Sequence, residues 1–191
     1  MIEDKAVVGF DKKKLIEAFG GSVKATPRDS RETVPIILKA LEAFVRAIDR
    51  MPEDKVNWSA SQRQRPMGEF VSHIIKIVRK TFEELGPIGS PPLPQPSESP
   101  FTCFREIAHY GELVIEKYRT WVPSLTLAPL NAPISATAGA KSSEERLDIL
   151  AGHIIHHLRQ LYSILDSLGI AVDDRVPDSQ WPSEYVLSLL W

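Results

Sequence analysis

Three of the chain's five histidines lie within ten residues, in the stretch AGHIIHHLRQ at positions 151–160. Neutral imidazole is a common protein ligand of divalent metal ions. Residues four apart lie on one face of a helix, so His153 and His157 could bind one ion from adjacent turns. A third ligand from a neighbouring helix would leave coordination positions open for water or substrate, as a catalytic site requires.

The angle of each histidine around its helix sorts the candidates, because successive residues are about 100° apart. His153 and His157 fall at the edge of an apolar arc, whereas His156 falls on the polar side. His73 lies at the border of the apolar arc of an earlier segment, and His109 points away from the apolar stripe of its own segment. The angles favour His73, His153 and His157. A hydrogen-bonded packing histidine is the alternative at each position.

Two further polar residues lie within one turn of these histidines. Glu69 precedes His73 by four residues and could orient an imidazole or act as a general base. The alternative for Glu69 is a carboxylate that only stabilises a helix N-terminus. Gln160 follows His157 by three residues and could hydrogen-bond a ligand or the substrate.

Four segments carry the apolar periodicity of helices and would have to position these residues. The first helix is expected to be capped by Thr33, with Pro35 in its first turn. The third is expected to stop at Pro123, and the last at Gly169. The expected helices are 34–49, 66–85, 101–122 and a segment that begins after Ser142–Glu145.

The connections between the last three segments are long and rich in Pro, Gly and Ser, at 86–100 and 123–141. The expected fold is therefore all-α, a four-helix bundle at 29–170 with long crossover loops. An N-terminal extension at 1–28 carries a short helix at 11–19. A C-terminal apolar tail at 171–191 ends in WPSEYVLSLLW. This tail either docks on the bundle or forms a subunit interface, as in a homodimer.

Composition narrows the function classes. The 191 residues are 43% hydrophobic and 25% charged, with a net charge of −2 and scattered basic residues. This balance is typical of a soluble globular protein that binds neither nucleic acid nor membranes. The single cysteine, Cys103, excludes an internal disulfide, and its place in the apolar stripe of the third segment favours a buried thiol. The N-terminus lacks a signal-peptide apolar core, so we expect a cytoplasmic protein.

Three motifs, taken in order, resemble those of the DinB-like (YfiT-like) metalloenzyme superfamily. They are MPEDKVNW at 51–58, PMGEFVSH at 66–73 and HIIHHLRQLYSILDSLGI at 153–170. The resemblance covers about Thr33 to Ile170. It departs from the family pattern at Leu158-Arg159, where members often have Arg-Gly, and this departure bears on the substrate.

The resemblance implies a bacterial four-helix bundle with His73, His153 and His157 as ligands of a divalent metal, zinc or nickel. It also implies a small-molecule substrate and either hydrolysis or transfer that depends on a low-molecular-weight thiol. Three neutral imidazoles leave a metal its full charge, which suits both reactions. Two other interpretations stay open: a non-catalytic ligand-binding or stress-response bundle, and a structural or oligomerising bundle.

Overall fold

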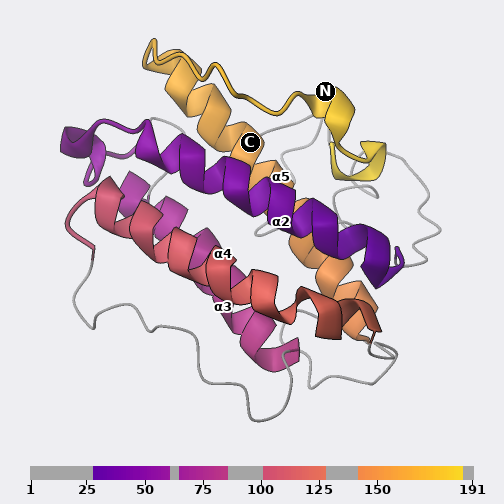
Figure 1. Ribbon diagram of the computed structural model, residues 1–191. Coiled ribbons are helices and arrows are strands. Elements are labelled where there is room, and N and C mark those ends of the chain that lie inside the picture. Colours follow the sequence, from indigo (N-terminus) through magenta and orange to yellow (C-terminus); the bar gives the residue numbers. More distant parts are fainter. Residues whose placement is uncertain (1–27, 61–64, 86–100, 128–141, 187–191) are drawn as a thin grey trace, which may run out of the picture.

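The computed structural model describes residues 28–60, 65–85, 101–127 and 142–186, and gives only the backbone for 124–127. These residues form four α-helices and three short 3-10 turns, with no β-strand in the described ranges. The helices pack as a bundle (Figure 1). They are α2 (Ser30–Asp49), α3 (Met67–Leu85), α4 (Phe104–Leu127) and α5 (Ser143–Ser167), and the turns are η1 (Glu53–Lys55), η2 (Asp178–Gln180) and η3 (Ser183–Tyr185).

The four expected helices are therefore present, and the all-α bundle is confirmed. The last helix ends just before Gly169, as its sequence indicates, but it begins at Ser143 and so includes residues that were expected to precede it. The Ser142 side chain caps its start by accepting from the backbone N–H of Glu145. Gly169, with φ of 73°, follows its end in the left-handed conformation that glycine adopts without strain. The expected helix at 11–19 lies outside the described residues.

The start of α2 corrects two expectations. Asp29, rather than Thr33, is the N-cap, and its carboxylate accepts from the backbone N–H of Arg31. Thr33 is buried in the first turn, where its hydroxyl donates to the backbone carbonyl of Asp29 at 3.1 Å. Pro35 consequently lies in the second turn of α2, where it removes one backbone hydrogen bond.

The third helix also differs from its expected bounds. It begins at Phe104 because the Glu53 carboxylate accepts from the backbone N–H groups of Phe104 (2.6 Å) and Arg105 (3.1 Å). Pro123 does not end it, since α4 continues to Leu127 with the proline inside. Cys103 therefore precedes the helix, partly buried, and is not in its apolar stripe as predicted.

The helix directions follow from pairs of residues in contact. On α3 and α4, Gly68 lies beside Ile107 and Phe82 stacks on Tyr118 with ring centroids 3.8 Å apart. The contacts therefore run in the same order along both helices, so α3 and α4 are parallel. The end of α3 at Leu85 and the start of α4 at Phe104 therefore lie at opposite ends of the bundle, which requires a long connection.

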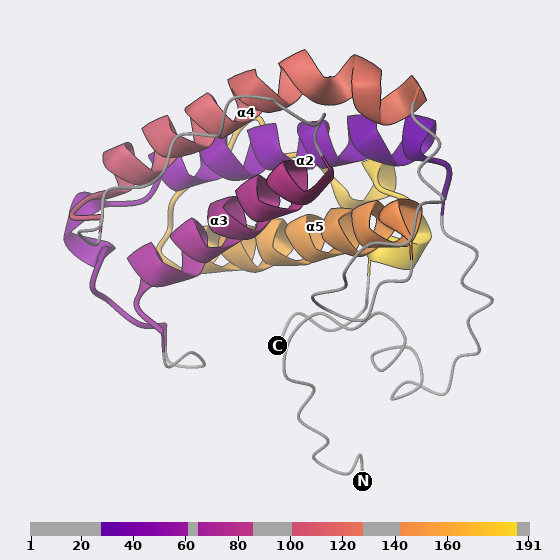
Figure 2. The same ribbon diagram turned by 90° about the horizontal axis from the view of Figure 1, so that it is seen from below.

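Helix α2 makes the most extensive contacts in the bundle, with α4 and with α5. Helix α3 packs on the same two helices and completes the bundle (Figure 2). Close approach of α4 to α2 depends on Gly111. A Cβ atom at this position would lie 2.5 Å from Cγ2 of Val45 and 3.1 Å from Cδ1 of Ile75. The Tyr118 hydroxyl donates to the backbone carbonyl of Val34 inside the same interface.

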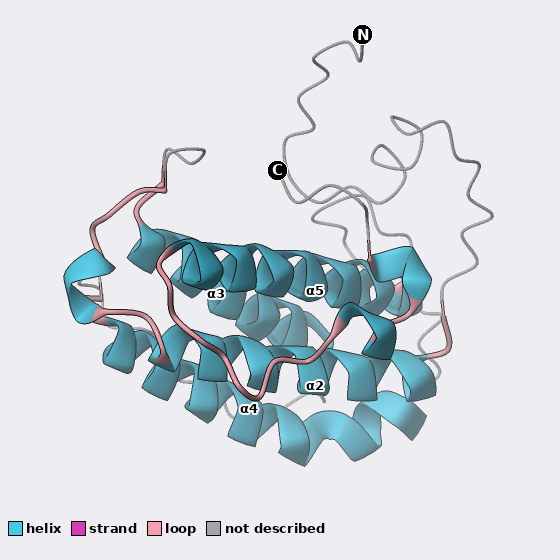
Figure 3. Cartoon of the chain, turned by 90° about the horizontal axis from the view of Figure 1, so that it is seen from above, coloured by secondary structure: helices cyan, strands magenta, loops and turns pink. Residues whose placement is uncertain are grey.

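The first part of the C-terminal tail docks on the bundle, as one of the two interpretations predicted. We call residues 171–186 the C-terminal strap. It runs back along α5 and α2 as an extended segment (Figure 3). Trp181 and Tyr185 are buried, at 6% and 0% exposure. Among the described residues, four ion pairs link the strap to the rest of the chain: Arg46–Asp174, Arg175–Asp166, Arg159–Asp178 and Arg28–Glu184.

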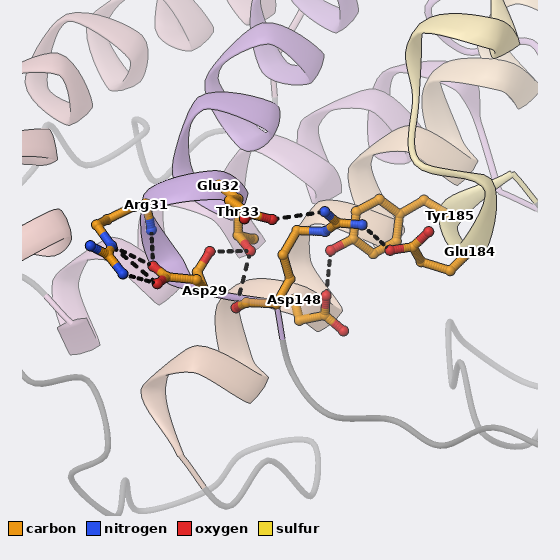
Figure 4. A network of polar contacts seen from close by, with 8 residues as sticks. Asp29, Arg31, Glu32, Thr33, Asp148, Glu184 and Tyr185 are labelled. Atoms are coloured by element: carbon orange, nitrogen blue, oxygen red, sulfur yellow. Dashed lines mark hydrogen bonds and ion pairs between the residues drawn. The ribbon is translucent and has the colours of Figure 1, made fainter.

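The end of the strap forms a polar network with the start of α2 (Figure 4). Arg28 donates to Glu32 of α2 and to Glu184 of the strap. The Tyr185 hydroxyl donates to the buried carboxylate of Asp148 on α5. None of the helices in the described part of the chain combines the length and the apolar character that crossing a bilayer would need.

Candidate metal centre

The three favoured histidines come together between α3 and α5. These helices are antiparallel neighbours, because Phe70 packs edge-on against the ring of His157 and His73 packs against His153. All three imidazoles are partly buried. The neighbouring position of the two helices, which spacing in the sequence could not show, is thus established.

The first turn of α3, the helix that carries His73, is anchored on the segment before it. The backbone N–H of Met67 donates to the carbonyl of Trp58, and that of Gly68 donates to the carbonyl of Val56. A Cβ atom on Gly68 would lie 2.7 Å from the Val56 side chain. Glycine therefore allows the start of α3 to approach this segment, and the approach fixes where His73 lies.

Ring distances test whether the three imidazoles fit one ion. The centroids of His153 and His157 are 4.5 Å apart, with the rings 73° from coplanar. Two imidazoles at metal–nitrogen distances of about 2.0–2.1 Å have centroids about 5 Å apart, so this pair fits a shared ion. The centroids of His73 and His153 are 6.3 Å apart, so His73 would have to move closer. Within the described ranges, no three His, Cys, Asp or Glu side chains are already placed to hold a metal.

Gln160 fixes the orientation of one candidate ligand. Its amide Oε1 lies 2.7 Å from Nδ1 of His157, and the Gln160 side chain is buried. Since a carbonyl oxygen can only accept, Nδ1 of His157 carries the proton and donates. The lone pair of the neutral ring is then on Nε2, as in metal-bound histidines whose second nitrogen donates to a carbonyl or carboxylate.

The surroundings of His153 and His73 favour the neutral form that metal binding requires. Burial, together with the nearby His73, His156 and Arg146, lowers the pKa of His153 to about 3. The pKa of His73 is lowered as well, first by burial and then by the positive charges of Arg65 and Lys76.

The remaining polar candidates and histidines differ in how near they lie to the three favoured histidines. Glu69 is exposed in the first turn of α3, one turn before His73. His109 is exposed on α4, as expected, with its Nδ1 3.5 Å from the carboxylate of Glu112. His156 is partly buried rather than on an open polar face, and its ring lies 5.3 Å from that of His157. The structure therefore separates His156 from the site less clearly than the helical angles did.

Arg146 is a residue beside the site that the sequence did not indicate. It lies on α5 two turns before His153, is only 7% exposed, and its charge lowers the pKa of that histidine. An isolated arginine in the first turn of a helix is normally a surface residue, so no signal in the sequence distinguished it.

Comparison with known proteins identifies the family of the chain. No curated protein and no solved structure gives a significant match. The family model described as the DinB superfamily matches residues 37–161, more than half of the chain, from α2 through all three histidines of α5 to just beyond Gln160. The chain therefore belongs to the DinB superfamily.

Proposed function

We propose that the protein is a metal-dependent enzyme whose metal ligands are His73, His153 and His157. The observation that carries this proposal is that the imidazoles of His73, His153 and His157, from two antiparallel helices, are neighbours, with ring centroids 6.3 Å apart for His73 and His153 and 4.5 Å apart for His153 and His157. His73 is partly exposed, so its side chain can rotate toward the other two. Membership of the DinB superfamily supports the same ligand set.

The protein groups have distinct roles in this proposal. His153 and His157 form the fixed part of the site, because they share one helix and Gln160 holds the His157 ring. His73 closes the set from α3. Phe70 packs its edge against His157 and keeps water from that side of the ring. Glu69, one turn from His73, is the candidate general base, and its exposed carboxylate can reach a substrate from the solvent side.

A divalent zinc or nickel ion held by three neutral imidazoles would supply Lewis acidity and would lower the pKa of a bound water or thiol. We infer either hydrolysis of a small molecule or its transfer with a low-molecular-weight thiol, in the cytoplasm of a bacterium. An oligomerising role for the tail gains no support from residues 181–185, because Trp181 and Tyr185 are buried against the chain's own helices.

Elemental analysis of protein purified without chelator tests the proposal. We expect about one divalent ion per chain in the unaltered protein. The His73→Ala variant should lose it, whereas His156→Ala, which alters a neighbouring histidine of similar burial, should retain it. Absence of metal after reconstitution with zinc, nickel and manganese would refute the proposal. Equal loss in both variants would refute the assignment of ligands.

A further inference from the structure

Arg146 is a buried cation with at least one donor that has no hydrogen-bond partner among the described residues. Its side chain is 9% exposed, and Oε2 of Glu84 lies 3.7 Å from its Nη2, beyond hydrogen-bonding distance. Within the described part of the chain, Nε of Arg146 is buried with no hydrogen-bond partner. A guanidinium has five N–H donors, and leaving them unsatisfied in the interior is costly. Such a group calls for an explanation beyond packing.

The carboxylate beside Arg146 does not saturate it. Glu84 lies in the last turn of α3 and is also 4.0 Å from the Nζ of Lys80. Thr81, one turn before Glu84 on α3, is fully buried, and its hydroxyl makes no hydrogen bond to the described residues. The buried Thr81 hydroxyl is one turn from Glu84 on α3, and the Glu84 carboxylate is 3.7 Å from the Arg146 guanidinium, so both donors belong to the same stretch of α3 and its neighbour α5. Their natural shared partner is an oxyanion.

The position of Arg146 relates this polar group to the histidines. Seven residues, or two helical turns, separate Arg146 from His153, so both lie on nearly the same face of α5. The corresponding rise is about 10 Å, which a small organic acid can span together with the two side chains. Pairing of His73 with His153 and of Glu84 with Arg146 shows that α3 lies alongside this entire stretch.

We propose that Arg146 binds the carboxylate or phosphate group of an anionic substrate whose reacting end lies at His73, His153 and His157. This inference rests on the proposed function for the identity of the reacting end, but the anion site itself does not. Arg146 is a binding residue here. Thr81 contributes its hydroxyl, and Glu84 is the group that the incoming anion displaces from the guanidinium.

Calorimetric titration of the full-length protein with inorganic phosphate and with acetate tests the anion site, with acetamide as the neutral control. Comparing the two anions shows which oxyanion the site prefers. Arg146→Gln should weaken binding about ten- to hundredfold, as expected for the loss of a charge-assisted hydrogen bond. The matched control is Arg105→Gln, which removes an exposed arginine of α4 and should leave binding unchanged.

Two further measurements distinguish failure of the anion site from failure of the proposed function. Glu84→Gln removes the competing carboxylate and should tighten anion binding several-fold, which tests the inference even if Arg146→Gln does not fold. Titrations of chelator-treated protein exclude binding of the anion to a metal. Anion binding that is lost in Arg146→Gln, in protein that never holds metal, would support the anion site and refute the proposed function. Binding that is absent, equal in both arginine variants, or unaffected by Glu84→Gln would overturn the inference.

Discussion

Nδ1 of His157 lies 2.7 Å from Oε1 of Gln160, one turn further along α5. This contact ties a candidate metal ligand to a buried amide on its own helix, so the orientation of the ring is set before any ion arrives. Preorganisation of this kind raises metal affinity because less side-chain freedom is lost on binding.

Replacing Gln160 should therefore weaken metal binding without removing a ligand. We expect Gln160→Leu to lower the affinity about 10- to 100-fold, the range found when partners of metal-bound histidines are removed. Gln160→Glu keeps an acceptor at Nδ1 and should retain most of the affinity. Competition with a chromophoric chelator measures both variants. Equal affinity of Gln160→Leu and the unaltered protein would show that the contact only stabilises the fold.

The low pKa of His153 predicts a loss of stability in acid. The folded state keeps this imidazole neutral down to about pH 3, whereas the unfolded chain protonates it below about pH 6.5. Between these values the unfolded state binds the extra proton, so the free energy of unfolding should fall as pH falls, by up to about 1.4 kcal/mol per pH unit.

Urea unfolding of chelator-treated protein at several pH values measures this slope. His153→Leu should flatten it, whereas His109→Gln, at an exposed position, should leave it unchanged. Metal-free protein is used because metal binding itself depends on pH. An unchanged slope in His153→Leu would contradict the prediction.

Removal of the Tyr185 hydroxyl should destabilise the protein. The hydroxyl donates to the buried carboxylate of Asp148, and burial of the ring together with that carboxylate raises the pKa of Tyr185. Tyr185→Phe should cost about 1–3 kcal/mol of unfolding free energy, the range for leaving a buried polar group without its partner. Tyr162→Phe, which loses only a 3.3 Å contact from the Val176 N–H, should cost less. Thermal unfolding compares the two, and a reversed order would contradict the prediction.

Close packing at Gly111 predicts a cost for the smallest possible side chain. Gly111→Ala places a methyl group against Val45 and should destabilise the protein by about 1–3 kcal/mol, despite the higher helix propensity of alanine. Val45→Ala removes the atoms that the methyl group meets, so the double variant should lose less than the sum of the single losses. A double-mutant cycle by urea unfolding measures the difference. Strict additivity would show that α4 and α2 adjust in another way.

The helices could be predicted from the sequence wherever the residues that form or end them lie close together in the chain. Periodic apolar residues mark all four helices, and Gly169 marks the end of α5 because a C-terminal glycine acts within a few residues of the helix end. The start of α4 could not be predicted in this way, because its N–H groups are satisfied by Glu53, about fifty residues earlier. Pro123 was wrong as a helix end, since a proline can lie inside a helix at the loss of one hydrogen bond.

The candidate site, too, could be predicted only where its residues lie close together in the sequence. Helical angles alone brought His153 and His157 to one edge of α5, because that relationship depends only on helix geometry. The pairing of His73 with His153 and the burial of Arg146 depend on how α3 and α5 pack, which no spacing within one helix encodes. Their roles in binding metal and substrate stay predictions.

The ion pair between Arg28 and Glu184 brings the first and last described segments into contact. In topological terms, the described chain is almost a closed ring. A circular permutant could therefore join the strap to the start of α2 through a short linker and open new termini between Leu85 and Phe104. In that arrangement α5, the strap and α2 would become consecutive in the sequence, while both helices of the histidine site would keep their present neighbours.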